Sequence, residues 1–294
     1  MSQTTESASS RFSTLEDWSS ADLVTGILEG QFSAIAAVQA ATPALVEAID
    51  RGAERLARGG RLVYLGAGTS GRIATQDAAE LPPTFNWPYE RAIALMAGGQ
   101  GAVFHAAEGA EDSEQLAIEA LDGIEVTEND VVIALAASGR TPYAIGGLVH
   151  ARGRGALTIG IFNNRGGKLG DVAEIPILID TGPEILAGST RMKAGTAQKA
   201  ALNVISTGVM IRLGFVYRGL MVEMKPTNSK LQDRAAKMVA TLADTDYATA
   251  ENTLAEAGGV IKLATVMLLK SLDRPAAEAV LAKAGGNLRT ALAD

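Results

Sequence analysis

The chain has 294 residues, a formal net charge of -7 and a pI near 5.1. This acidic balance argues against general affinity for nucleic acid, and the absence of cysteine excludes disulfides and thiolate zinc sites. Hydrophobic residues make up 47% and aromatic residues 4%, which is typical of helices packed closely on a sheet. Neither a run of 18 apolar residues nor a basic-then-apolar start occurs. We therefore expect a soluble, cytoplasmic protein with one α/β domain and a smaller piece.

The N-terminal part is predicted to be a tail followed by helices. Residues 1–10 are rich in Ser and Thr and poor in apolar residues, which predicts disorder. Residues 11–50 are predicted to form an N-terminal helical segment, because apolar residues recur there at helical spacing. Pro43 marks a boundary between two of its helices.

Between residues 51 and 225, short apolar runs alternate with helical stretches. Strands are expected at 62–65, 92–96, 131–135, 157–161 and 175–179. Helices are expected near 70–80, with a break at Leu81-Pro82-Pro83, and then near 112–121, 142–152 and 189–213. This α/β pattern indicates a doubly wound parallel sheet of five strands, of the flavodoxin-like kind. Residues 226–294 are rich in Ala and Leu with glycine and proline breaks, which predicts a small C-terminal helical domain.

The stretch RLVYLGAGTSGR, residues 61–72, combines a buried strand, a glycine turn and the start of a helix. Backbone N–H groups, the helix dipole and the hydroxyls of Thr69 and Ser70 make such a turn a phosphate site, with Gly68 at its centre. One alternative is dinucleotide binding, because the glycines fit G-x-G-x-x-G. That fingerprint needs an acidic residue after the second strand, where Ala97-Gly98-Gly99 stands. Another alternative is a turn that only packs a helix on the sheet.

Two further segments repeat this pattern of small residues and hydroxyls before a helix. Ser138, Gly139 and Thr141 follow the third predicted strand, and they could bind the same phosphate unless the hydroxyls only cap their own helix. Ser189 and Lys193 open the long helix before residue 213. A cation there opposes the helix dipole, so either it binds an anionic substrate or it is simply solvated.

Two carboxylates stand out as candidate catalytic groups. Glu80 ends the helix that begins at the first loop, and Glu111 follows the second strand at the edge of the sheet where ligands bind. Either could instead be a helix-cap acid. The two histidines, His105 and His150, form no metal-ligand pattern, and the G-x-S-x-G and G-K-[ST] motifs are absent. The residues therefore predict carboxylate chemistry on a phosphorylated small molecule, without a metal or another cofactor.

Five segments in this order resemble the N-acetylmuramic acid 6-phosphate etherase family, within the sugar isomerase (SIS) fold group. They are GAGTSGR (66–72), DAAELPPTF (77–85), EGAEDS (108–113), AASGRTPY (136–143) and GSTRMKAGTAQK (188–199). The glucokinase regulatory protein is a non-enzymatic member of the same group. The family pattern has Cys where Leu81 stands, and Cys-Asn-Pro where this chain has Phe162-Asn163-Asn164.

The resemblance implies a lyase that converts N-acetylmuramate 6-phosphate to N-acetylglucosamine 6-phosphate and D-lactate in cell-wall amino-sugar recycling. A base removes the C2 proton of the open-chain sugar, lactate leaves from C3, and water adds to the double bond. Glu80 matches the acid that protonates lactate, and Glu111 matches the second carboxylate, a candidate C2 base. The resemblance also implies a homodimer. The alternatives are a sugar-phosphate-sensing regulator without turnover and an aldose–ketose isomerase on the same fold.

Overall fold

The computed structural model describes residues 4–105 and 107–293, which separate into two compact units. The first contains the chain up to Ala79 and Tyr89–Gly208; the second contains Glu80–Pro88 and the chain from Val209 onward. The second unit therefore begins earlier than the expected boundary at residue 225. It includes residues 209–225 and the short segment 80–88. Residues 1–3 of the predicted disordered tail lie outside the described residues.

The first unit is built on a parallel sheet of five strands in the order β2-β1-β3-β4-β5. The strands are β1 (Leu62–Gly66), β2 (Ala92–Met96), β3 (Val131–Leu135), β4 (Leu157–Phe162) and β5 (Ile175–Leu178). All five predicted strands and the doubly wound, flavodoxin-like fold class are thus confirmed. Strands β1 and β3 are neighbours, with Gly66 opposite Leu135, so the loops that follow them leave the sheet side by side.

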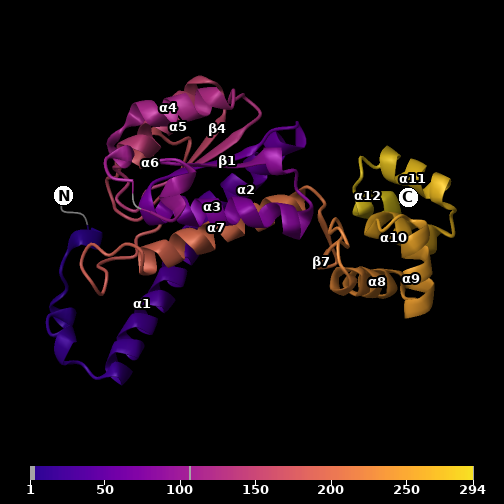
Figure 1. Cartoon of the computed structure of the whole chain (residues 1–294), viewed down its shortest axis with the longest axis horizontal. Coiled ribbons are helices and arrows are strands. Elements are labelled where there is room, and N and C mark those ends of the chain that lie inside the picture. Colours follow the sequence, from indigo (N-terminus) through magenta and orange to yellow (C-terminus); the bar gives the residue numbers. More distant parts are fainter. Residues whose placement is uncertain (1–3, 106, 294) are drawn as a thin grey trace. The chain divides into compact units, whose positions relative to one another are not determined.

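Helices cover both faces of this sheet (Figure 1). α4 (Glu114–Gly123), α5 (Pro142–Gly153) and α6 (Lys168–Val172) pack with Val63, Leu65 and Val132 on one face. α2 (Thr42–Ala57), α3 (Gly68–Phe85) and α7 (Lys193–Arg212) lie on the other. Because α3 and α5 follow neighbouring strands onto opposite faces, the loops after β1 and β3 lie at the switch point, which is where such sheets bind ligands.

Three local predictions differ from the structure. α3 continues through Pro82 and Pro83 to Phe85, although each proline removes a helical hydrogen bond. Leu81 and Phe85 beside them are buried, and this burial offsets the cost of the prolines. The tail is not disordered over its described part, because Thr4–Glu6 forms a 3₁₀ turn in which Thr5 is fully buried. α7 begins at Lys193, not near residue 189.

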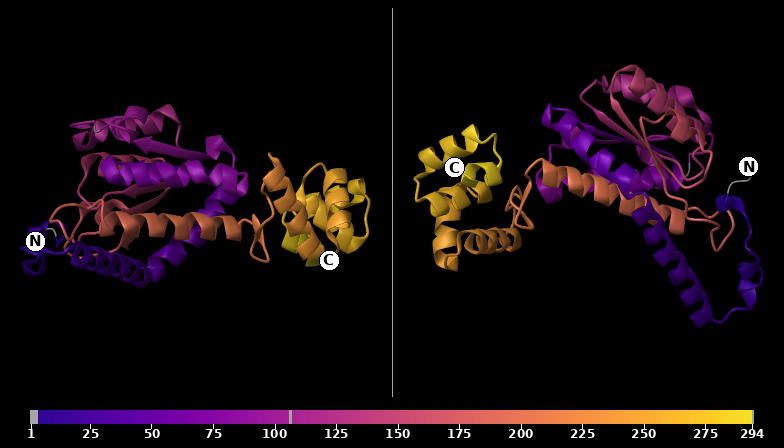
Figure 2. Two further views of the ribbon diagram at one scale, coloured as in Figure 1. Left: turned by 60° about the horizontal axis from the view of Figure 1, so that its bottom comes forward. Right: turned by 180° about the vertical axis from the view of Figure 1, so that it is seen from behind.

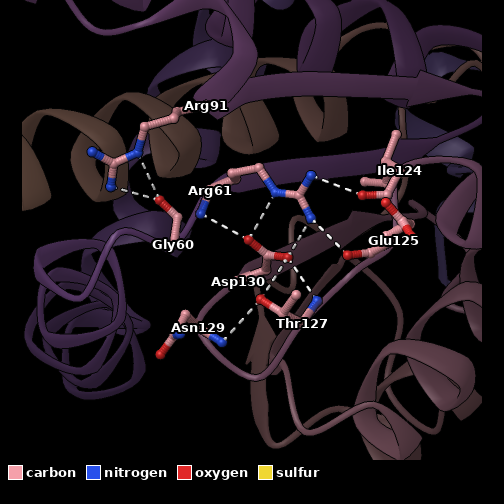
Figure 3. Close-up of polar contacts among 8 residues, drawn as sticks. All are labelled: Gly60, Arg61, Arg91, Ile124, Glu125, Thr127, Asn129 and Asp130. Atoms are coloured by element: carbon pink, nitrogen blue, oxygen red, sulfur yellow. Dashed lines mark hydrogen bonds and ion pairs between the residues drawn. The ribbon is translucent and has the colours of Figure 1, made fainter.

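A polar cluster joins the amino ends of β1 and β3 (Figure 3). Asp130, 1% exposed, accepts hydrogen bonds from Arg61 Nε at 3.0 Å, Arg61 Nη2 at 2.7 Å and the Thr127 N–H at 2.8 Å. Arg61 also donates to the carbonyls of Ile124 and Glu125. Burial tends to raise the pKa of Asp130, but the hydrogen bonds outweigh burial and lower that pKa. The cluster ties together the end of the sheet opposite the loops that follow β1 and β3.

The remaining 3₁₀ helices of the first unit are short connections. They are Ser10–Phe12, Leu15–Asp17, Tyr89–Arg91, Gln100–Val103 and Ala110–Asp112.

The second unit is a helical bundle with its own apolar core, as predicted for the C-terminal part. A hairpin of β6 (Val216–Tyr217) and β7 (Leu220–Met221), which the sequence did not predict, precedes five helices. These are α8 (Ser229–Ala243), α9 (Tyr247–Glu256), α10 (Ile261–Lys270), α11 (Arg274–Lys283) and α12 (Leu288–Ala293). Lys262 of α10 pairs with Glu223 and donates to the Gly286 carbonyl, which joins three segments of the bundle.

α1 (Ser20–Ala40) extends away from the layers of the first unit (Figures 1 and 2). Its Val24, Leu28, Phe32 and Ile35 are 51–75% exposed and recur at helical spacing, so they form one apolar stripe. In the described part of the chain, α1 has the length and hydropathy of a membrane span, and α9 with α10 would pass only across a 115° bend. One or two such helices are weak evidence that a chain spans a membrane, because an exposed apolar stripe can also pack against a partner helix.

Candidate functional site

The loop after β1 presents backbone N–H groups at the start of α3. Gly68 is exposed and adopts a φ of +53°, and α3 begins there, so the first N–H groups of the helix have no helical partner. Gly71 packs so closely on the loop that a Cβ would lie 2.7 Å from the Gly66 carbonyl oxygen. Thr69 is half-buried beside this loop. The geometry is that of an anion site at a helix N-terminus.

Ser70 has a different environment from Thr69. It is 8% exposed, and its hydroxyl donates to Gln198 Oε1 at 2.9 Å. Gln198 in turn donates to Asn163 Oδ1 at 3.1 Å, and Asn163 donates to the Ile179 carbonyl at 2.9 Å. This buried chain links the loops after β1, β4 and β5 through α7. The role that the structure assigns to the Ser70 hydroxyl is therefore to join loops, and its contact with phosphate stays a prediction.

The loop after β3 stands beside the first loop at the switch point of the sheet. Gly139 has a φ of +66°, and a Cβ there would lie 2.8 Å from Gly167 Cα, so only glycine fits. Ser138 Oγ accepts the Arg140 N–H at 3.1 Å and so shapes the turn. Thr141 precedes α5, but its side chain accepts no capping hydrogen bond. Simple capping therefore does not explain the Thr141 hydroxyl.

The beginning of α7 approaches the first loop, since a Cβ on Gly195 would lie 3.6 Å from Thr69 Cγ2. Lys193 is the first residue of this helix, and Ser189 is half-buried in the turn before it. The buried carboxylate of Glu184 accepts the N–H groups of Lys193 at 3.1 Å and Ala194 at 2.9 Å. Glu184, which sequence reasoning did not select, thus already binds the N-terminus of α7.

Burial also shifts the two charges at this helix start. It raises the pKa of Glu184, against the opposing effect of the backbone hydrogen bonds and Lys193. It lowers the pKa of Lys193, against the opposing charges of Glu184 and Asp180. Lys193 therefore stands beside a carboxylate and is not a simply solvated cation.

Glu111 lies beside the first loop, as its position after β2 predicted. It lines a cavity of about 220 Å³ together with Gly68, Arg72 and Glu108. Arg72 donates to the carbonyls of Ala102 and Val103 and so holds the segment after β2 against α3. The structure thus brings the Glu111 carboxylate to a cavity that the loop after β1 and the segment after β2 line together.

Glu80 lies near the other end of α3, and its side chain is exposed. One turn earlier, Asp77 is 5% exposed and accepts hydrogen bonds from the Tyr64 hydroxyl at 2.8 Å, Asn203 at 2.7 Å and Ser206 at 3.2 Å. Burial first, and then the Asp77 charge, raise the pKa of Tyr64 well above its usual value. Asp77, which the sequence did not single out as catalytic, fixes α3 to β1 and α7 just before Glu80.

Comparison with known proteins shows the same family as the motifs. The glucokinase regulatory protein N-terminal SIS domain matches residues 44–152, and the SIS domain matches residues 114–207. The N-acetylmuramic acid 6-phosphate etherase of Deinococcus radiodurans is 50% identical over 84% of this chain and 81% of its own length. That of Lactobacillus gasseri is 48% identical over 92% of this chain and 91% of its own length.

This chain belongs to the N-acetylmuramic acid 6-phosphate etherase family. A homologue from Enterobacter sp. is 45% identical over 95% of this chain, so the similarity extends through both units. A phosphoheptose isomerase from Francisella tularensis superposes on 66% of this chain and 98% of its own, with 18% identity and a TM-score of 0.49. That value is too low to add to the assignment.

Proposed function

We propose that Glu80 and Glu111 of this etherase are its acid and base, and that each active site takes them from two different copies of the chain. As a member of the family, the protein is a carbon–oxygen lyase that cleaves the D-lactyl ether of N-acetylmuramate 6-phosphate. Its products are N-acetylglucosamine 6-phosphate and D-lactate. The observation that supports the phosphate end of the site is the pair of glycine loops at the switch point, with Gly68 and Gly139 in left-handed conformations.

In the proposed site, the substrate phosphate binds the N–H groups and hydroxyls of the loops containing Gly68, Thr69, Ser138 and Thr141. Glu111 removes the C2 proton, which the C1 aldehyde of the open-chain sugar acidifies. The C3–O bond then breaks, and its electron pair leaves with the lactyl oxygen, which Glu80 protonates. Water adds across the C2–C3 double bond at C3 and restores the hydroxyl, as the two carboxylates exchange roles. One carboxyl must be protonated while the other is ionised.

The length of α3 supports a second copy as the source of Glu80. Ala79, the residue before Glu80, is eleven positions after Gly68, which corresponds to about 16 Å along the helix axis. Six bonds separate the phosphorus from the ether oxygen of the substrate, which is about 7 Å when extended, and a glutamate side chain adds about 5 Å. The substrate and the side chain together therefore reach less far than the helix extends, so Glu80 falls short of a substrate bound at the Gly68 loop of its own chain. α3 runs from that loop toward the amino ends of the strands.

A homodimer would supply the missing carboxylate. The apolar stripe of α1, Val24, Leu28, Phe32 and Ile35, gives the first unit a surface that a second copy could cover. We also propose that the enzyme acts in the cytoplasm, where a sugar phosphate derived from the cell wall would be recycled.

The experiment measures D-lactate release by the wild type, by Glu80→Gln and Glu111→Gln, and by a co-expressed mixture of the two variants. Each variant alone should lose activity, because it lacks one carboxylate in every site. In the mixture, half of the randomly paired dimers are mixed, and one of their two sites is intact. Activity should therefore return to about one quarter of the wild-type value.

Glu108→Gln is the matched control, because Glu108 lines the same cavity as Glu111 but has no proposed role. It should keep its activity. An inactive mixture of folded, dimeric variants would show that the two carboxylates act within one chain or are not the pair. A wild type that binds N-acetylglucosamine 6-phosphate without releasing lactate from the substrate would favour the sensing regulator. Ketose formation without lactate would favour the isomerase.

A further inference from the structure

The N-terminal turn Thr4–Glu6 is hydrogen-bonded to the segment after β4 and to the turn before α7, although Thr5 and Asn164 are 159 residues apart in the chain. The Thr5 N–H donates to Asn164 Oδ1 at 3.1 Å, and Asn164 Nδ2 donates to Thr5 Oγ1 at 2.9 Å. The Thr5 carbonyl accepts the Gly188 N–H at 2.9 Å. Every polar group of Thr5 is therefore used in a contact with a distant loop.

These contacts reach the neighbours of two residues that are predicted to bind the phosphate, Ser138 and Ser189. Asn164 Nδ2 also donates to the carbonyl of Ala137 at 2.9 Å, and Ala137 precedes Ser138. Gly188, which has a φ of +77° that strains any residue with a Cβ, precedes Ser189. One buried threonine thus ties the loop after β3 to the turn before α7.

The hydrogen bonds between Thr5 and Asn164 are buried, so losing one of them would cost free energy. Thr5 is fully buried and Asn164 is 1% exposed, so water cannot readily replace a missing partner. Both N–H groups of the Asn164 amide are used, one on Thr5 and one on Ala137. Removing the Thr5 hydroxyl leaves one of them unsatisfied, and the amide can regain a partner only by moving, which would displace the loop containing Ser138.

We propose that Thr5 is a positioning residue of the sugar-phosphate site, which acts through Asn164 and Gly188 on the loops containing Ser138 and Ser189. Thr5 itself does not touch the substrate in this proposal. It reduces the freedom of the two loops, so that less ordering remains to be done when the phosphate binds. The proposal rests on the proposed phosphate loops but not on the assignment of Glu80 and Glu111.

The test compares Thr5→Val with Thr5→Ser and with Thr4→Val. Valine keeps the shape of threonine and removes the hydroxyl, whereas serine keeps the hydroxyl. Thr4→Val makes the same change one residue earlier. Calorimetry with N-acetylglucosamine 6-phosphate measures binding, D-lactate release measures KM and kcat, and thermal unfolding measures stability.

We expect Thr5→Val to weaken sugar-phosphate binding and to raise KM about tenfold while kcat changes less than about twofold. Thr5→Ser should restore binding, and Thr4→Val should resemble the wild type. Asn164→Ala should also weaken binding, and adding Thr5→Val to it should change little more, because Asn164→Ala already removes the hydrogen bond to the Thr5 hydroxyl.

Wild-type binding and KM in a Thr5→Val variant with a lowered melting temperature would overturn the proposal, because the contact would then be only structural. A failure of serine to rescue binding would overturn it as well. The two proposals fail in different ways. If the wild type bound the sugar phosphate but released no lactate, the catalytic assignment would fall, and the binding data would still decide the role of Thr5.

Discussion

Replacing Asp130 by Asn should destabilise the first unit without changing the site. In the asparagine variant, Oδ1 can keep its bonds with the Arg61 N–H and Nε. The new Nδ2 would face the Arg61 Nη2 and Thr127 N–H donors at the positions where Oδ2 accepted them. Two hydrogen bonds become donor–donor contacts, and the Arg61 charge loses its partner.

The size of the effect follows from burial. Breaking a buried ion pair by removing one partner costs about 3–5 kcal/mol, and the 22% exposure of the Arg61 side chain places this pair near 3 kcal/mol. With a urea m-value of about 2.5 kcal/mol/M, the midpoint for the first unit should fall by about 1 M. Circular dichroism during urea titration measures this shift.

Asp122→Asn is the matched control, because Asp122 pairs with Arg154 and His150 at an exposed position and should change the midpoint little. The pKa of Asp130 is lowered in the folded state, so its charge stabilises the fold above the carboxyl value of the unfolded chain, 3.8. The stability difference between wild type and Asp130→Asn should therefore be constant near neutrality and shrink as the pH falls below about 4. Equal midpoints for Asp130→Asn and Asp122→Asn, or a difference that grows in acid, would refute this reasoning.

Two further changes test the site and the proposed dimer. Gly139→Ala places a Cβ 2.8 Å from Gly167 Cα at a φ of +66°, and binding of N-acetylglucosamine 6-phosphate should weaken at least about tenfold by calorimetry. Gly153→Ala, where a Cβ meets nothing within 4 Å, is its control, and equal affinities would contradict the predicted role of the loop. Phe32→Asp, in the α1 stripe at 75% exposure, should shift sedimentation from dimer to monomer, whereas Phe104→Asp at 84% exposure should not. A dimeric Phe32→Asp variant would exclude the stripe as the contact.

The sequence by itself determined the architecture of the sheet and the position of its binding loops. Each strand is a short run of apolar residues bounded by glycine or polar residues, and such runs can only be buried between layers of helices. The glycines at 68 and 139 marked backbone turns that need a left-handed conformation, which is a local property of the chain. Glu111 could be placed at the binding edge because it follows a strand whose direction was already known.

Only the tertiary structure decided what these loops are attached to. Thr5 looked like part of a disordered tail, since nothing near it in sequence can bury it; Asn164, 159 residues away, supplies its partners. Glu184 and Asp77 looked like ordinary acids until the N-terminus of α7 and the Tyr64 hydroxyl were brought to them. The prolines at 82 and 83 predicted a break, and burial of Leu81 and Phe85 overrode it. The local preference of a residue for helix or loop contributes little free energy compared with burying whole apolar side chains. Packing therefore decides the structure where the two conflict.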